Sequence, residues 1–212
     1  MFRIDHHLHT SRHSPDSIID PLELVKHAKA IGLDALVITE HDYQWEAKEL
    51  ADLNRQSDGL LVLSGAEVSA REGHFLVYGL PNLDEVGPGI SLGALLKVTR
   101  RFDAAVIAAH PFRWDQDFAA IAEEYGAGLE ALELVSNNVT ESTRALTQSV
   151  LSKYTSLGAS GSSDGHQIDV IGCYHSAFPQ PISMITGFVT ALKQRSGKPQ
   201  HLPGMLCACG AI

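Results

Sequence analysis

Short strand-like runs alternate with helix-like segments along almost all of the 212 residues, and this alternation restricts the fold more than any other feature. Runs of about four to eight apolar residues are typical of buried strands, whereas capped amphipathic segments are typical of helices. The strand-like runs are 2–8, 35–39, 60–66, 75–80, 104–109, 129–135, 159–163 and a short segment near Cys173. The helix-like segments are 20–32, 45–53, 91–102, 118–125, 140–157 and 183–195. This order predicts an α/β domain built on a parallel sheet, either closed as a barrel or doubly wound.

The boundaries of the first helix-like segment are well marked. Asp20 is a typical N-cap, Pro21 suits the first turn, and Glu23 stands three residues after the cap. Gly32 is a typical C-terminal stop.

No linker, internal repeat or low-complexity segment interrupts the alternation, so the sequence predicts one domain over residues 1–196. The hydrophobic content of 44% is enough for one sizeable core. The tail, 197–212, has no clear periodicity, and we expect it to be either frayed or packed on a neighbouring segment.

Composition and charge exclude several classes of partner. The formal net charge of -9 makes a long nucleic acid an unexpected partner, because most of the surface would repel it. No apolar run approaches the roughly 20 residues that cross a bilayer, and the N-terminus has no apolar signal core. The 3 cysteines are too few for a disulfide framework. We therefore expect a cytoplasmic protein without membrane contact; its oligomeric state stays open.

The chain has 11 histidines, and two of them form a His-x-His pair at the end of the first strand-like run. Period-two alternation puts His7 and His9 on one face, where both imidazoles can hold one ion. Asp5 shares that face, and we expect it to orient a ligand imidazole. His6 points to the opposite face and is expected to be packed or at the surface.

Further histidines and carboxylates follow the later strand-like runs. They occur in Thr39-Glu40-His41-Asp42, Gly65-Ala66-Glu67, Gly73-His74, Ala109-His110-Pro111 and Ser163-Asp164-Gly165-His166. A single histidine beside glycine or proline is common in loops. The ordered recurrence predicts one shared site where the βα loops gather.

Together these motifs resemble those of the PHP (polymerase and histidinol phosphatase) superfamily. The resemblance runs in the family's order from Asp5-His6-His7-Leu8-His9-Thr10 to Asp164-Gly165-His166, and Gly172-Cys173-Tyr174 with Phe178 resembles a segment of its small members. It implies a distorted (β/α)7 barrel with up to three divalent metal ions at the carboxyl ends of the strands.

The resemblance also implies which residues bind the ions. The first ion would be held by His7, His9, Glu67 and Asp164. Glu67 would bridge to a second ion bound by His74 and His110. A third ion would be held by Asp16, His41 and His166. The family more often has Asp than Glu before the His of the second motif; Glu40 is not a ligand, so we expect little consequence.

The chemistry of these side chains favours the same kind of site. Imidazole and carboxylate donors without thiolate suit Mn²⁺, Fe²⁺ or Zn²⁺. Two to three such ions would make hydroxide available at neutral pH and neutralise phosphate oxygens during attack. The spacing does not identify the general acid that protonates the leaving oxygen.

Three further positions are candidates for contact with substrate. Arg113 follows the His110 motif closely enough to reach a substrate phosphate, with a solvated loop arginine as the alternative. Arg12 is a second candidate at the rim, with the same alternative. Asn137 and Asn138 either touch substrate or cap their loop.

We therefore predict a metal-dependent phosphoesterase that hydrolyses a small phosphorylated metabolite or nucleotide. The alternatives are a nuclease that trims oligonucleotide ends, a histidinol-phosphate phosphatase, and a non-catalytic metal-binding regulatory module. A basic groove with exposed aromatic side chains would favour the nuclease, whereas the charge of -9 and the aromatic content of 7% disfavour it. A non-catalytic module would be marked by lost ligands, and here the whole set is present.

Overall fold

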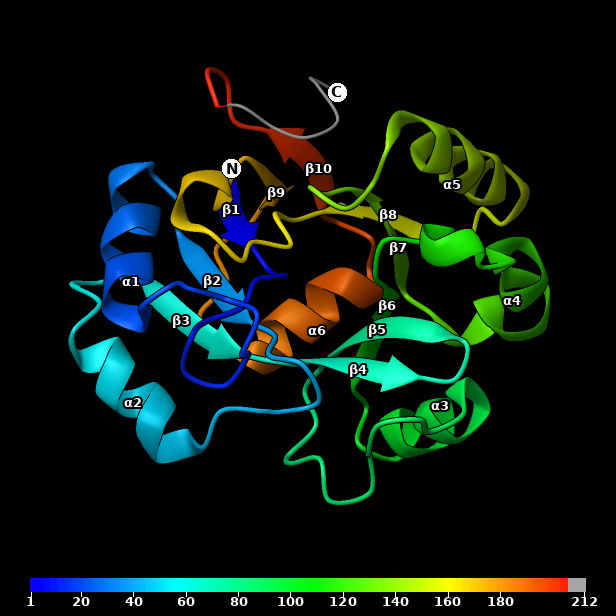
Figure 1. Cartoon of the computed structure of the whole chain (residues 1–212), viewed down its shortest axis with the longest axis horizontal. Coiled ribbons are helices and arrows are strands. Elements are labelled where there is room, and N and C mark those ends of the chain that lie inside the picture. The colour runs from blue at the N-terminus through cyan, green and yellow to red at the C-terminus, as the bar shows by residue number, and fades with distance from the viewer. Residues whose placement is uncertain (206–212) are drawn as a thin grey trace.

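Strands and helices alternate over residues 1–205, which are the residues described by the computed structural model (Figure 1). The strands are β1 (Phe2–Asp5), β2 (Ala35–Ile38), β3 (Leu61–Ser64), β4 (Ala66–Ala70), β5 (Gly73–Tyr78), β6 (Ala105–Ala108), β7 (Ala131–Val135), β8 (Gly158–Gly161), β9 (Tyr174–Phe178) and β10 (Lys198–His201). The α-helices are α1 (Pro21–Ala30), α2 (Ala47–Arg55), α3 (Leu92–Arg101), α4 (Phe118–Tyr125), α5 (Glu141–Lys153) and α6 (Ile185–Lys193). Three 3₁₀ turns are η1 (Arg113–Asp115), η2 (Gly126–Gly128) and η3 (Ile168–Val170).

The predicted helices are confirmed, and their caps explain where they begin. The Asp20 side chain accepts hydrogen bonds from the backbone N–H groups of Leu22 and Glu23, so α1 begins at Pro21. Ser91 caps α3 in the same way by accepting from Ala94 N. Helix α5 ends at Lys153, earlier than predicted, because Tyr154 leaves helical geometry with φ -112° and ψ 79°.

The strands form two five-stranded sheets, in the orders β10-β9-β1-β2-β3 and β4-β5-β6-β7-β8. The β1-β2-β3 and β6-β7-β8 segments are parallel, as predicted. The expectation of a wholly parallel sheet is wrong for β5, β9 and β10, which run antiparallel to their neighbours. Only two residues join β4 to β5, and so short a connection can only reverse the chain direction.

The two sheets approach each other at the carboxyl ends of the parallel strands. Isolated bridges connect Leu8 with Gly165 and His41 with Glu67. Within residues 1–205 no continuous ladder closes the sheets into one barrel, so the structure supports an α/β fold of two sheets and does not confirm the closed (β/α)7 barrel. The sheets separate at Gly65, the residue between β3 and β4.

Most buried apolar side chains pack in three large clusters, and a fourth, small cluster consists of Val135, Cys173 and Tyr174. One cluster, which includes Leu24 and Leu36, joins the first sheet to α1 and α2, and another, which includes Leu96 and Phe118, joins the second sheet to α3–α5. The third lies between the sheets and contains Phe188 of α6. Figure 1 shows α6 at the centre of the view with the other helices around the outside. The strands are thereby fixed from both sides.

The first part of the segment after residue 196 forms a strand. Strand β10 pairs antiparallel with β9, so residues 198–201 form an edge of the first sheet. Cys207 and Cys209 lie outside the described residues. Among residues 1–205, no helix combines the length and the apolar character that a membrane crossing requires.

Candidate metal centre

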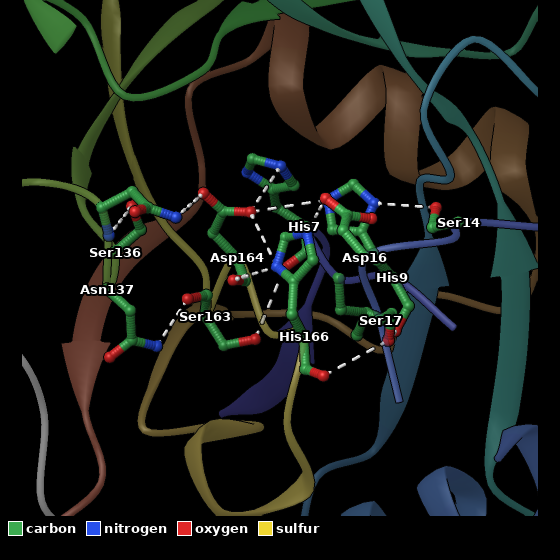
Figure 2. A network of polar contacts seen from close by, with 12 residues as sticks. His7, His9, Ser14, Asp16, Ser17, Ser136, Asn137, Ser163, Asp164 and His166 are labelled. Carbon is green, nitrogen blue, oxygen red and sulfur yellow. Dashed lines mark hydrogen bonds and ion pairs between the residues drawn. The ribbon is translucent and has the colours of Figure 1, made fainter. Parts of the chain in front are cut away.

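Two histidines and two carboxylates meet where the two sheets approach each other. His7 Nε2 lies 3.4 Å from Glu67 Oε2 and 3.2 Å from Asp164 Oδ1. His9 Nε2 lies 3.3 Å and 3.4 Å from the same two oxygens. Figure 2 shows the side chains of His7, His9 and Asp164 turned toward one another. All four residues are buried.

These four side chains fit a divalent cation. Among the described residues, His7 Nε2, His9 Nε2 and Glu67 Oε2 are buried without a hydrogen-bond partner. A buried polar atom without a partner is costly. One donor atom from each of the four residues lies within 4.8 Å of the others, so one ion can bind all of them. Two imidazole nitrogens and two carboxylate oxygens suit a borderline or hard divalent metal.

A second group lies on the other side of Glu67. Glu67 Oε1 is 2.8 Å from His74 Nδ1 and 3.1 Å from His110 Nε2. These three residues also place donor atoms within 4.8 Å of one another. Both carboxylate oxygens of Glu67 therefore face imidazoles, which is the geometry of a bridging carboxylate.

A third group lies toward solvent. Asp16 Oδ2 is 3.1 Å from His41 Nε2 and 3.2 Å from His166 Nε2. His9 joins His41 and His166 within the 4.8 Å distance, and His41 Nδ1 is 2.9 Å from Glu67 Oε2. All nine residues predicted as ligands therefore lie in one region.

The strand directions explain this convergence. His7 and His9 follow β1, His41 follows β2, and His110 follows β6, so the parallel strands present them at their carboxyl ends. His74 is near the start of its strand. Because β5 runs antiparallel to β4 and β6, its amino end lies at the same side, and Ser69 pairs with His74.

Glu133 is a member of the site that the sequence analysis missed. This buried carboxylate lies in the middle of β7, and its Oε1 is 2.9 Å from His7 Nδ1. Its Oε2 accepts a hydrogen bond from His110 N at 2.8 Å, and Ser162 Oγ donates to Oε1 at 2.5 Å. A carboxylate can only accept, so Nδ1 of His7 carries a proton toward Glu133, and Nε2 is the nitrogen that faces Glu67 and Asp164. A lone Glu in the apolar run Ala131–Val135 was the available signal.

Asp5 does not have the predicted role. It accepts hydrogen bonds from Ser163 N at 2.9 Å and Gly172 N at 2.8 Å, and so fixes the loops around Asp164 and does not orient an imidazole. Burial raises the pKa of Asp5 to about 6. The prediction was wrong because β1 ends at Asp5, beyond which strand alternation no longer relates side-chain directions.

Glu40 lies outside the three groups, yet it anchors the loop that holds Asp16. Its buried carboxylate accepts hydrogen bonds from Thr10 N at 3.0 Å, Ser14 Oγ at 2.5 Å and Trp45 Nε1 at 2.9 Å. Ser14 Oγ also lies 3.3 Å from His9 Nδ1. Glu40 therefore contacts the centre through Ser14.

The charges of the central group depend on one another. Burial alone would raise the pKa of Glu67, but the imidazoles of His7, His110 and His41 outweigh it and hold that pKa well below its ordinary value. Burial opposes a charge on His9, but the nearby carboxylates of Asp164 and Glu67 outweigh it and raise the pKa of His9 to about 9. Without an ion, His9 is therefore protonated at neutral pH, and a bound cation must displace that proton.

The two candidate arginines differ in position. Arg113 Nη1 lies 3.9 Å from Asp164 Oδ2, on the wall of the central cavity, which is the hollow lined by most of the candidate ligands. Arg12 is not brought to the site. Its Nε and Nη2 donate to Glu49 Oε1 at 3.0 Å and 2.8 Å, in a separate hollow. Asn138 Nδ2 donates to Asp164 Oδ2 at 2.6 Å, whereas Asn137 Nδ2 donates to Ser163 O at 2.6 Å.

The remaining histidines lie apart from the three groups. His6 is packed, as predicted, with Nδ1 2.9 Å from Tyr78 Oη and Nε2 3.1 Å from Ser176 Oγ. Burial lowers its pKa to about 4. Among the described residues, the central cavity of about 580 Å³ is lined by Ser69, Asn138, Arg113 and Trp114 and by the candidate ligands other than His7 and His9.

A family model described as PHP domain matches residues 5–195 of the chain. A curated relative, an uncharacterized protein of Methanocaldococcus jannaschii, is 28% identical over 98 residues, which cover 46% of this chain and 56% of the relative. The chain thus matches little more than half the length of that relative.

Several solved structures have a similar fold. PsfC from Pseudomonas syringae superposes with a TM-score of 0.66 at 20% identity, covering 92% of this chain and 95% of PsfC. A putative metal-dependent phosphoesterase from Bifidobacterium adolescentis has a TM-score of 0.58 at 18% identity, covering 77% and 87%. A lesion-specific endonuclease from Pyrococcus furiosus has a TM-score of 0.65 at 16% identity, covering 94% of this chain and 57% of the endonuclease. At these identities the likeness concerns the fold.

Proposed function

The chain belongs to the PHP domain family, and from this membership we propose that it is a metal-dependent phosphoesterase that hydrolyses a small phosphorylated metabolite or nucleotide. The observation that carries the proposal is the central group of buried donor atoms. Two imidazole nitrogens and one carboxylate oxygen point at one another there without hydrogen-bond partners among the described residues. A divalent cation is the simplest occupant that satisfies all of them.

We assign two to three divalent ions, Mn²⁺, Fe²⁺ or Zn²⁺, to the three groups. His7, His9, Glu67 and Asp164 would hold the first ion, Glu67, His74 and His110 the second, and Asp16, His41 and His166 the third. When bound, such ions lower the pKa of water and neutralise phosphate oxygens. Glu133 and Ser14 keep Nε2 of His7 and of His9 directed at the ions.

Arg113 is the side chain of this site best suited to bind the phosphate. Its guanidinium reaches within 3.9 Å of Asp164, and it is a fork-shaped donor that matches phosphate oxygens. Asn138 holds the second oxygen of Asp164, which fixes the carboxylate beside that guanidinium. A substrate phosphate in the central cavity would contact the Arg113 guanidinium on one side and face the candidate ligands on the other.

A nuclease acting on oligonucleotide ends is the second candidate. The fold likeness to the Pyrococcus endonuclease favours it. The net charge of -9 opposes it, since the phosphates of a long strand beyond the cavity would meet repulsion. The full set of nitrogen and oxygen donors opposes a non-catalytic module. Histidinol phosphate is a small ester and stays among the possible substrates.

Parallel assays of the Mn²⁺-loaded protein test this function. The protein is incubated with a mononucleotide, with histidinol phosphate and with a labelled single-stranded oligonucleotide, each at the same concentration of esterified phosphate. The Glu67→Ala variant is the inactive control. We expect turnover of a small ester and little cleavage of the oligonucleotide. Processive degradation of the oligonucleotide with no turnover of either ester would replace the phosphatase with the nuclease.

A further inference from the structure

The turn after β6 places a tryptophan at the mouth of the central cavity, and the proposed hydrolysis does not use it. The side chain of Trp114 is 64% exposed. Its ring centroid is 5.0 Å from that of His74 and 5.5 Å from that of His110, two candidate ligands. Arg113 Cζ lies 4.2 Å from the indole centroid. An exposed indole and a guanidinium therefore stand together beside the centre.

The backbone of this turn is strained. Four non-glycine residues have positive φ: His110 (28°), Phe112 (67°), Trp114 (55°) and Asp115 (58°). Residues other than glycine rarely adopt this backbone conformation. Such strain is concentrated at binding sites, where the surrounding structure enforces it.

Hydrogen bonds and ring packing fix the turn on the side away from the cavity. Gln116 Oε1 accepts a hydrogen bond from Phe112 N at 3.3 Å, and Gln116 Nε2 donates to Glu72 O. The Phe112 ring packs edge-on against Phe118 of α4, with 5.8 Å between centroids. The turn is therefore fixed on its inner side, while Trp114 remains exposed at the cavity.

Building on the proposed function, we propose that Trp114 and Arg113 select a phosphate ester whose organic part carries one flat aromatic ring, as a mononucleotide does. The indole would stack on the ring, and the guanidinium would bind the phosphate beside Asp164. Both contacts lie on one wall of a cavity of about 580 Å³, which is within the size range of sites for small ligands.

The cavity favours one ring over an extended strand. Trp114 is the single Phe, Tyr or Trp side chain among the described residues that line it. Surfaces that bind single-stranded nucleic acid stack several successive bases on aromatic side chains and track the backbone with positive charge. One indole beside one arginine, on a chain of net charge -9, matches a single nucleotide.

Binding of two non-hydrolysable analogues tests this proposal. The phosphonates that mimic adenosine monophosphate and ribose 5-phosphate differ only in the base, and calorimetry with the metal-loaded protein measures their affinities. Base stacking on an aromatic side chain corresponds to about 5- to 150-fold in affinity. We therefore expect the adenosine analogue to bind at least about fivefold more tightly, and we expect it to quench the indole fluorescence.

Variants separate the two contacts. Trp114→Ala should reduce the affinity ratio of the two analogues to about one and abolish the quenching, whereas Trp114→Phe should keep part of the ratio. Arg113→Ala should weaken the binding of both analogues alike, because both carry the phosphonate group. Equal affinities in the wild type, no binding of either analogue, or an equal loss of both in Trp114→Ala would overturn the proposal.

Activity assays distinguish a failure of the ring recognition from a failure of the proposed function. If adenosine monophosphate and ribose 5-phosphate are hydrolysed with equal kcat/KM, the phosphoesterase stands and the ring recognition fails. If the analogues bind with the expected dependence on Trp114 but no phosphomonoester is hydrolysed, the ring recognition stands and the phosphoesterase fails.

Discussion

The hydrogen-bond partner at Nδ1 determines that His7 and His9 direct Nε2 toward the centre. His7 has Glu133 at Nδ1, and His9 has Ser14, itself bound to Glu40. Residues that orient metal-ligating histidines typically change metal affinity by about 10- to 100-fold when they are replaced. Replacement of Glu133 or Glu40, two buried carboxylates outside the ligand set, is therefore expected to lower the affinity for metal ions.

Glu133→Gln should lower the affinity for Mn²⁺ by about 10- to 100-fold, because the amide keeps the shape but removes the charge that favours the required form of His7. Competition calorimetry against a chelator measures the change. Glu141→Gln makes the same replacement at the exposed start of α5 and should leave the affinity unchanged. Equal affinities for wild type and Glu133→Gln would contradict the orienting role.

Glu67→Ala should remove more metal than any other single replacement among the candidate ligands. Its two oxygens face His7, His9 and His41 on one side and His74 and His110 on the other. Asp16→Ala should remove one ion at most, because Asp16 contacts only the outer group. Elemental analysis of the purified variants measures the counts, and full occupancy in Glu67→Ala would rule out its bridging role.

His6 should make the fold sensitive to acid. Burial lowers its pKa to about 4, whereas in the unfolded chain the pKa is about 6.5. As pH falls from about 6.5 to 4, the unfolded state takes up the proton first, so the free energy of unfolding falls, by on the order of 3 kcal/mol in total.

His6→Gln removes this titration. Urea unfolding of the metal-free proteins should show a wild type that is more stable at pH 7 by a margin that narrows toward pH 4.5. A margin independent of pH would show that His6 does not contribute the acid sensitivity.

At the scale of elements, the sequence predicted which segments become helices and strands better than how the strands pair. Periodicity and caps depend on local residues, so α1 and α4 were located closely. Strand direction depends on connections. The segment 60–66 was predicted as one strand, but the structure divides it at Gly65 into β3 and β4 of different sheets.

Gly65 lies at this division and has no room for a side chain. A Cβ there would stand 2.7 Å from both Val77 O and Tyr78 Cδ1. Gly65→Ala should therefore lower the free energy of unfolding by about 1–3 kcal/mol, as overpacking does. Gly87→Ala is the control, since no atom lies within 4 Å of its added Cβ, and its change should stay within about 0.5 kcal/mol. Similar values for both would contradict the steric account.

At the scale of the whole molecule, the resemblance to the PHP superfamily gave the set of candidate ligands, and most of them lie where one end of the fold gathers the residues that follow parallel strands. The sequence analysis did not find the orienting role of Glu133 or the placement of Trp114. Glu133 looks like one residue of a buried strand, and only the pairing of β7 with β6 and β8 brings it to His7. The position of Trp114 depends on a turn with several positive φ values, for which the local residue types give no signal.

The candidate ligands come from both sheets, so a bound ion would connect them. His7 and His9 follow β1 in the first sheet, whereas Glu67 lies in β4 and Asp164 follows β8 in the second. An ion bound only by the folded protein stabilises it by about 2.7 kcal/mol at a hundredfold excess over Kd. Mn²⁺ should therefore raise Tm relative to the chelator-treated protein, and Glu67→Ala should lose most of that increase.

The size of this increase should depend on pH in a defined direction. Without an ion the pKa of His9 is about 9, so over the neutral range His9 is protonated and its Nε2 must lose a proton before it can bind the ion. Proton competition grows as pH falls, so metal affinity, and with it the metal-dependent part of Tm, should decrease from pH 8 to pH 6. Calorimetric scans with and without Mn²⁺ at pH 6, 7 and 8 measure it, with release of protons on Mn²⁺ addition in weak buffer as an independent readout. An increase in Tm that is the same at pH 6 and pH 8, with no proton release, would mean that the ion does not bind through the imidazole of His9.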